Sequence, residues 1–114
     1  MKRYIYITTQ FEGLHRYENA PEEVLFLRNY HRHLFKIRLQ IQVEHNERDI
    51  EFIMCKHAID NYIFQKYLDM KVNSSCETIA EELINYTKSI YGNRKVICEV
   101  SEDGENGAVL ESED

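Results

Sequence analysis

Two histidines, His31 and His33, stand two positions apart in this 114-residue chain. At the start of a β-strand, residues at this spacing leave one face of the sheet, while Arg32 between them leaves the opposite face. His15 ends an earlier β-like segment, and hairpin pairing of the two segments would bring it beside the pair. Three neutral imidazoles can bind zinc and leave a fourth position open, as in catalytic zinc sites. The spacing is therefore compatible with a zinc site of His15, His31 and His33, although so short a motif is more often a solvated surface pair.

Glu102 directly follows the β-like segment of residues 95–101 and precedes a turn that contains glycine. A carboxylate in that place can accept two parallel N–H bonds from the amide-and-amine edge of a pterin or guanine ring, and its charge strengthens this bidentate contact. The C-terminal part of the chain carries many other acidic residues. On these residues alone, an ordinary acidic turn is the simpler interpretation.

The three cysteines, Cys55, Cys76 and Cys98, are odd in number and widely spaced. This usage is typical of free thiols in a reducing compartment rather than of a disulfide framework. Cys55 and Cys98 lie in apolar segments, where cysteine usually behaves as a small buried hydrophobic residue. Cys76 falls near a predicted helix start, where the helix dipole can lower a thiol pKa. We nevertheless expect a structural role for it.

The elements that position these residues are predicted from hydrophobic periodicity. Residues 36–43 alternate polar and apolar without exception, which predicts a strand with Ile37, Leu39, Ile41 and Val43 on one buried face. Residues 50–68 have apolar side chains at helical spacing. A second helix is predicted to begin near Ser74 and Ser75 and to end at Gly92. The remaining predicted strands are residues 1–11, 95–101 and 107–111, and residues 19–29 are predicted to form a loop over a site.

This order of elements predicts an α+β fold in which two helices cover one side of a four-stranded antiparallel sheet. The first predicted strand has apolar residues on both faces. We therefore expect another subunit to cover the second side of the sheet.

Composition and charge narrow the class of protein further. Hydrophobic residues make up 43% and charged residues 30% of the chain, with one proline and four glycines, which predicts one packed domain over residues 1–114. The net charge of −6, without a basic stripe, argues against nucleic acid as a partner. The apolar runs are far shorter than the roughly 20 residues that span a bilayer, and no signal-peptide pattern is present. We therefore expect a cytoplasmic protein with no membrane partner.

Four segments taken together resemble one known family. They are residues 11–16 (FEGLHR), residues 31–33 (HRH), Glu51-Phe52 ahead of Lys56, and residues 73–80 (NSSCETIA). In this order and at these spacings, they are similar to the 6-pyruvoyl tetrahydropterin synthase and 6-carboxytetrahydropterin synthase family. The resemblance extends from about Tyr4 to Glu111, nearly the whole chain.

The resemblance implies a tunnelling fold, or T-fold, in which trimers or hexamers close their sheets into a barrel with the ligand site between subunits. It implies Zn²⁺ as cofactor, held by His15, His31 and His33. It also implies that Glu102 anchors the ring of a pterin-like ligand and that the hydroxyl of Ser75 lies near that ligand.

The chain departs from the family pattern at the residues that move protons. The family's cysteine position corresponds to Leu27, and its Asp-His dyad corresponds to Phe64 and Gln65, none of which can act as a general base. The glycine between the paired histidines is Arg32. Two functions follow as hypotheses: a zinc-binding synthase-like lyase acting on a pterin or deazapurine precursor, or a non-catalytic protein that binds a pterin or purine nucleotide to sequester or sense it. A homo-oligomeric scaffold that retains only the fold is a weaker third.

Overall fold

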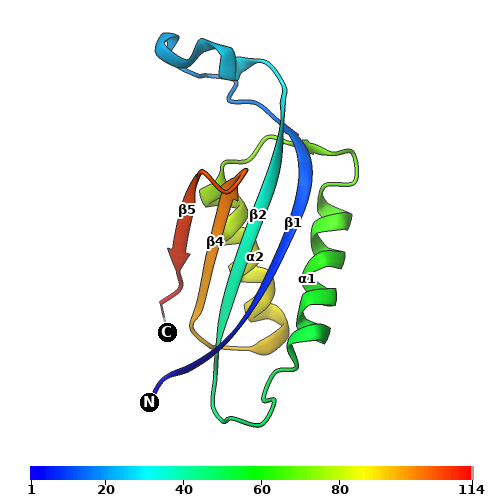
Figure 1. The fold of residues 1–114 in the computed structure, drawn as a ribbon, viewed down its shortest axis with the longest axis vertical. Coiled ribbons are helices and arrows are strands. Elements are labelled where there is room, and N and C mark those ends of the chain that lie inside the picture. Colours follow the sequence, from blue (N-terminus) through cyan, green and yellow to red (C-terminus); the bar gives the residue numbers. More distant parts are fainter. Residues whose placement is uncertain (114) are drawn as a thin grey trace.

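A five-stranded mixed sheet carries the candidate site, and two helices cover one of its faces (Figure 1). The computed structural model describes residues 1–113, so the last residue of the predicted domain lies outside the described part. The strands are ordered β3-β1-β2-β4-β5 across the sheet. The elements are β1 (Arg3–His15), the 3-10 helix η1 (Glu22–Arg28), β2 (His31–Val43), α1 (Phe52–Lys66), β3 (Lys71–Val72), α2 (Cys76–Tyr91), β4 (Val96–Glu102) and β5 (Asn106–Glu111).

The predicted α+β class is confirmed, but the prediction of a four-stranded, purely antiparallel sheet was wrong. The additional strand, β3, has only two residues and pairs in parallel with the end of β1, Leu14 opposite Lys71 and His15 opposite Val72. Two residues are too few to show an alternating pattern. Their pairing depends on where the chain returns after α1, and a local pattern does not contain that information.

The long hairpin of β1 and β2 forms the centre of the sheet. Its antiparallel register runs from Arg3 opposite Val43 to His15 opposite His31. The predicted inward-facing residues of β2 are all buried, which confirms the alternation; they are Ile37, Leu39, Ile41 and Val43. The strand also extends further than its alternating part, because the residues from His31 onward pair with the end of β1.

Each of the two α-helices begins at a side chain that accepts backbone N–H groups. The carboxylate of Glu51 accepts from Ile53 N and Met54 N at the start of α1, and the hydroxyl of Ser75 accepts from Thr78 N at the start of α2. The predicted helix start near Ser75 is therefore confirmed. The helices bury one face each, which comprises Cys55, Ile59 and Ile63 on α1, and Cys76, Ile79, Ala80, Leu83, Ile84 and Thr87 on α2. No helix in residues 1–113 has the length and apolar character that a bilayer crossing requires.

The connection between β1 and β2 projects beyond the sheet as an arm, at the top of Figure 1. We define the arm as residues 16–30. The predicted loop over residues 19–29 contains the 3-10 helix η1, and none of the η1 residues is buried. The side chain of Arg28 donates to the carbonyl oxygen of Ala20 at 2.8 Å, which links the two sides of the arm.

Gly13 allows β3 to approach β1 beside the site. A Cβ atom at this position would lie 2.5 Å from Cγ2 of Val72 and 3.2 Å from the ring of Phe35. Val72 and Phe35 are both fully buried and have no room to move away. The absence of a side chain at Gly13 therefore permits the strand pairing that positions His15.

An ion pair links the loop after β2 to the loop before β4. Nη1 of Arg94 donates to Oδ2 of Asp49 at 2.7 Å, and the backbone N–H of Glu44 donates to the same oxygen at 2.9 Å. The Arg94 hydrogen bond, followed by that of Glu44, holds the pKa of Asp49 below its usual value. Because the pKa is lowered on folding, the carboxylate stabilises the fold above its unfolded pKa of about 3.9, and this stabilisation is lost as the pH falls through the folded pKa.

We therefore expect Asp49→Asn to lower the urea midpoint of unfolding at pH 6, and the difference from the wild type to shrink below about pH 4, where the carboxylate becomes neutral. Urea titrations from pH 6 down to pH 2.5 measure this. Glu47→Gln in the same loop is the control, because Glu47 is exposed. A difference that stays constant with pH would contradict the assignment.

Candidate metal centre

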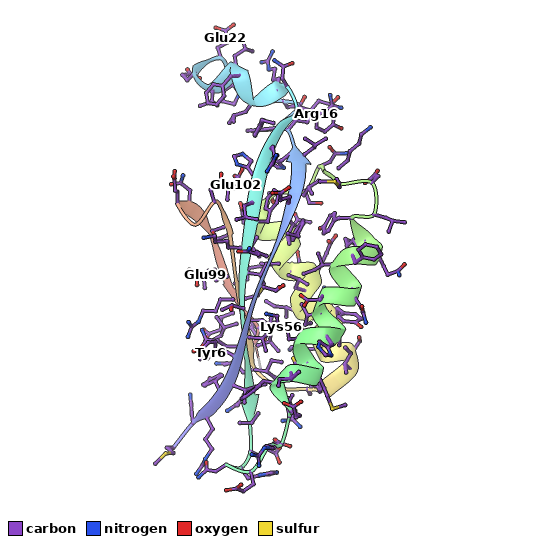
Figure 2. All side chains as sticks on the ribbon, turned by 45° about the vertical axis from the view of Figure 1, so that its right-hand side comes forward. Tyr6, Arg16, Glu22, Lys56, Glu99 and Glu102 are labelled. Carbon is purple, nitrogen blue, oxygen red and sulfur yellow. The ribbon has the colours of Figure 1, made fainter. Side chains whose placement is uncertain are left out.

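Four side chains with metal-binding atoms gather at the end of the sheet from which the arm projects. His15 pairs with His31, Gly13 with His33, and Phe35 with Glu102. Since alternate residues share a face, the three histidines and Glu102 lie on the same face as the buried side chain of Phe35. The predicted pairing of the strand ends that carry His15 and His31 is confirmed. Figure 2 shows Glu102 at this end of the sheet, with Arg16 at the base of the arm.

The imidazole rings lie close enough to share one ion. The ring centres are 4.6 Å apart for His31 and His33, 5.6 Å for His15 and His31, and 6.1 Å for His15 and His33. Around a tetrahedral zinc ion with Zn–N bonds of about 2 Å, ring centres would be about 5 Å apart. The tightest group of ligand atoms comprises His31, His33 and Glu102, whose atoms all lie within 4.8 Å of one another.

Each of the three rings has a hydrogen-bond partner at Nδ1. His15 Nδ1 lies 2.9 Å from the carbonyl oxygen of Val72, and His31 Nδ1 lies 2.8 Å from that of Asn29. His33 Nδ1 lies 2.7 Å from Oδ2 of the partly exposed Asp103. Because these partners only accept, each Nδ1 carries a proton. When a ring is neutral, its lone pair is then on Nε2, which in His33 faces Oε2 of Glu102. Histidines that bind metal ions are held in this way by an acceptor on the other nitrogen.

The Nε2 atoms of His31 and His33 both lie in surroundings that a cation would satisfy. Nε2 of His31 is buried and has no hydrogen-bond partner among residues 1–113. Nε2 of His33 lies 2.7 Å from Oε2 of Glu102, so two atoms with lone pairs face each other unless a proton or a cation lies between them. A proton on His33 would satisfy that contact and leave His31 Nε2 unpaired. A metal ion would satisfy both rings and the carboxylate together, so the donor set fits a metal ion.

The donor types agree with known chemistry. Two histidines and one glutamate form a recognised catalytic zinc set, and two histidines with one carboxylate also bind iron(II). Of the predicted zinc ligands, His31 and His33 belong to the group of ligand atoms within 4.8 Å, and His15 does not. Glu102, predicted as a ring anchor, lies in that group. The assignment of Zn²⁺ itself stays a prediction.

A cavity of about 590 Å³ opens beside these groups. Glu102 and Ser75, the two predicted ligand-binding residues, both line it, together with His15 and His31. Leu27 reaches it from the arm. Its other lining residues are Arg16, Tyr17, Asn73, Cys76, Glu77, Asn106 and Gly107.

The residues that line this cavity include no activated thiol. Cys76 is buried, and burial, followed by the nearby charges of Glu102 and Glu77, raises its pKa to about 11. A thiol with its pKa raised in this way is protonated at neutral pH. Phe64 and Gln65 are exposed on α1 and do not line the cavity.

Sequence reasoning missed Asp103, which contacts His33 and the backbone of β2. The residue has a positive φ of 61°, an angle more common for aspartate and asparagine than for most other residues. The N–H of Leu34 and the ring of His33 lower the pKa of its carboxyl group. An Asp-Gly pair directly after a strand that ends in Glu102 was the available signal, but it indicated only a turn.

No family model and no curated protein sequence matches the chain. The fold and the site together define its class: an α+β protein with a candidate His-His-carboxylate metal centre beside a cavity.

Proposed function

We propose that this protein binds a zinc ion through His31, His33 and Glu102, with the ring of His15 next to this group. We also propose that it binds a pterin- or purine-like ligand in the adjacent cavity. One observation carries the proposal: ligand atoms of His31, His33 and Glu102 lie within 4.8 Å of one another, while Nδ1 of both histidines is already hydrogen-bonded. Zinc, when bound, supplies Lewis acidity toward a carbonyl or hydroxyl oxygen of the ligand.

The carboxylate of Glu102 can bind both the metal ion and the pterin- or purine-like ligand. Its Oε2 faces His33, so Oε1 is the oxygen that would accept an N–H group from the ring of the ligand. The Ser75 hydroxyl already accepts from Thr78 N and donates to Thr78 Oγ1 at 3.2 Å. Ser75 therefore shapes the cavity through the start of α2, and Glu102 is the group that would recognise the ligand.

Two activities are consistent with such a site, and one set of observations favours binding without turnover. A synthase-like lyase needs a base or thiolate to move protons on the ligand side chain. Here Leu27 occupies the cavity wall and the Cys76 thiol is held protonated. We therefore propose capture of the ligand for sequestration or sensing, and we keep the 6-pyruvoyl or 6-carboxytetrahydropterin synthase-like reaction as the second candidate because of the sequence resemblance.

Metal analysis and substrate incubation test the proposal in one preparation. We expect about one zinc ion per chain by elemental analysis. In titrations with dihydroneopterin triphosphate, we expect saturable binding that is lost after zinc is removed, with the ligand recovered unchanged. Formation of product would support the lyase instead. Protein that neither retains zinc nor takes it up on titration would refute the metal site.

We further propose that the chain forms a homo-trimer or homo-hexamer in which neighbouring sheets join as in a T-fold barrel. From Arg3 to Gly13, β1 pairs on one side only among residues 1–113, and β5 forms the other edge of the sheet. Open edges of this length are usually covered. Basic side chains lie at one end of the β1 edge, Lys2, Arg3 and Lys56, although Glu12 and Asp60 lie further along it. Acidic Glu111 and Glu113 lie at the end of the β5 edge, where Lys95 is 4.0 Å from Glu111.

If the β1 edge of one subunit pairs with the β5 edge of the next, the subunits form a closed ring when the rotation between neighbours divides a full turn evenly. Native mass spectrometry is expected to show a trimer or hexamer, with partial dissociation in light-scattering measurements at high salt, because salt screens the charges along the edges. A monomer at both salt concentrations would contradict the assembly.

A further inference from the structure

Asp103, the residue after β4, is tied to β2 beside His33 by three hydrogen bonds. Its Oδ2 accepts from Nδ1 of His33 at 2.7 Å, and its Oδ1 accepts from the backbone N–H of Leu34 at 2.8 Å. Its own N–H donates to the carbonyl oxygen of Leu34 at 2.7 Å. The carboxylate therefore holds the ring and the backbone of neighbouring residues at once.

We infer that Asp103 is a positioning residue that keeps the proton of His33 on Nδ1 and turns the Nε2 lone pair toward His31 and Glu102. The consequence for metal binding rests on the function proposed above. A carboxylate that accepts a hydrogen bond from one nitrogen of a histidine fixes the tautomer and the orientation of the ring, and it increases the basicity of the other nitrogen, which binds the metal.

Among the three histidines, His33 is the only one whose recorded Nδ1 partner is a side chain. His15 and His31 rely on the backbone carbonyl oxygens of Val72 and Asn29. Those two tautomers are set by the fold and cannot be changed by substitution of the partner residue. The tautomer of His33 is the one that a single side chain controls, so Asp103 offers a direct test.

Asp103→Asn separates positioning from a role in the turn. The asparagine Oδ1 can still accept from Leu34 N, which preserves the turn. Its amide NH₂ would face His33 Nδ1, and a donor opposite a donor forces the proton of the neutral ring to Nε2. The lone pair would then lie on the nitrogen that points away from His31 and Glu102.

Nitrogen NMR of the imidazole groups, recorded on metal-free protein at pH 9, reads the tautomer directly, and chelator competition measures zinc affinity. In the metal-free protein, Oε2 of Glu102 at Nε2 competes with Asp103 at Nδ1 for the proton of His33. We expect the wild-type ring to be protonated at Nδ1, because Oδ1 of Asp103 is also fixed by the N–H of Leu34. Asp103→Asn should shift the proton to Nε2 and weaken zinc binding about 10- to 100-fold, with little change in the unfolding midpoint. Glu105→Gln, an exposed carboxylate in the same turn, is the matched control and should change neither quantity.

Protonation of His33 at Nε2 in the wild type, or unchanged tautomer and zinc affinity in Asp103→Asn, would overturn the inference. The wild-type spectrum decides this even if the variant does not fold. If the wild type shows the Nδ1–H tautomer but binds no zinc, the proposed metal function fails while the assignment of Asp103 to the tautomer stands.

Discussion

His33→Ala is expected to abolish stoichiometric zinc binding. The substitution removes one of the ligand nitrogens within 4.8 Å of its neighbours and leaves Oε2 of Glu102 without its nearest partner. Removal of a group that hydrogen-bonds to a metal-binding histidine already lowers metal affinity about 10- to 100-fold. Removal of the metal-binding histidine itself should therefore lower zinc affinity by more than about 100-fold. Chelator competition measures the affinity. His57→Ala is the matched control, because His57 is exposed on α1.

Substitutions of the other candidate ligands distinguish the two possible ligand sets. If His31, His33 and Glu102 form the set, Glu102→Gln should weaken zinc binding as strongly as His31→Ala, and His15→Ala should have a smaller effect. If the three histidines alone form it, as the resemblance implies, His15→Ala should match His31→Ala, and Glu102→Gln should impair ligand binding with zinc retained. Normal zinc affinity in both His31→Ala and His33→Ala would refute either set.

Phe35→Ala is expected to lower the free energy of unfolding by about 3–5 kcal/mol, the usual range for a buried phenylalanine. The Phe35 side chain has 0% exposure and stacks on the ring of Phe11, with ring centres 5.1 Å apart. Its ring also contacts those of His15 and His33 edge-on, at 5.8 and 6.1 Å. Since small domains are stable by only about 5–15 kcal/mol, this loss is a large part of the total.

Urea denaturation measures the change, and zinc affinity measured below the unfolding transition shows whether the cavity left by Phe35 also loosens the histidines. Phe64→Ala is the matched control, because the Phe64 side chain is 65% exposed and should contribute little. An unfolding midpoint for Phe35→Ala equal to that of Phe64→Ala would show that the phenylalanine beneath the site is not needed for stability.

Local patterns were sufficient for the elements that a single stretch of chain defines. The strict alternation through Ile37 and Val43 predicted a one-sided strand because side chains in a strand point alternately to opposite faces. The hydroxyl of Ser75 predicted a helix start because the first N–H groups of a helix need an acceptor. The same period of two placed His31 and His33 on one face, and the pairing of two long strands brought His15 to them.

Contacts between distant segments were decided only by the tertiary structure. The pairing of β3 with β1, the approach of Glu102 to His33 and the bond from Asp103 to His33 each join residues more than 50 positions apart. The burial of Cys76, which raises the pKa of its thiol, is likewise a result of tertiary packing. The sequence by itself determined that His31 and His33 share one face of a strand, because that property repeats along the chain, but it did not place Glu102 among the possible metal ligands. The distances between them and the protonation of each nitrogen arose only when the strands paired, because they depend on neighbours that no local pattern specifies.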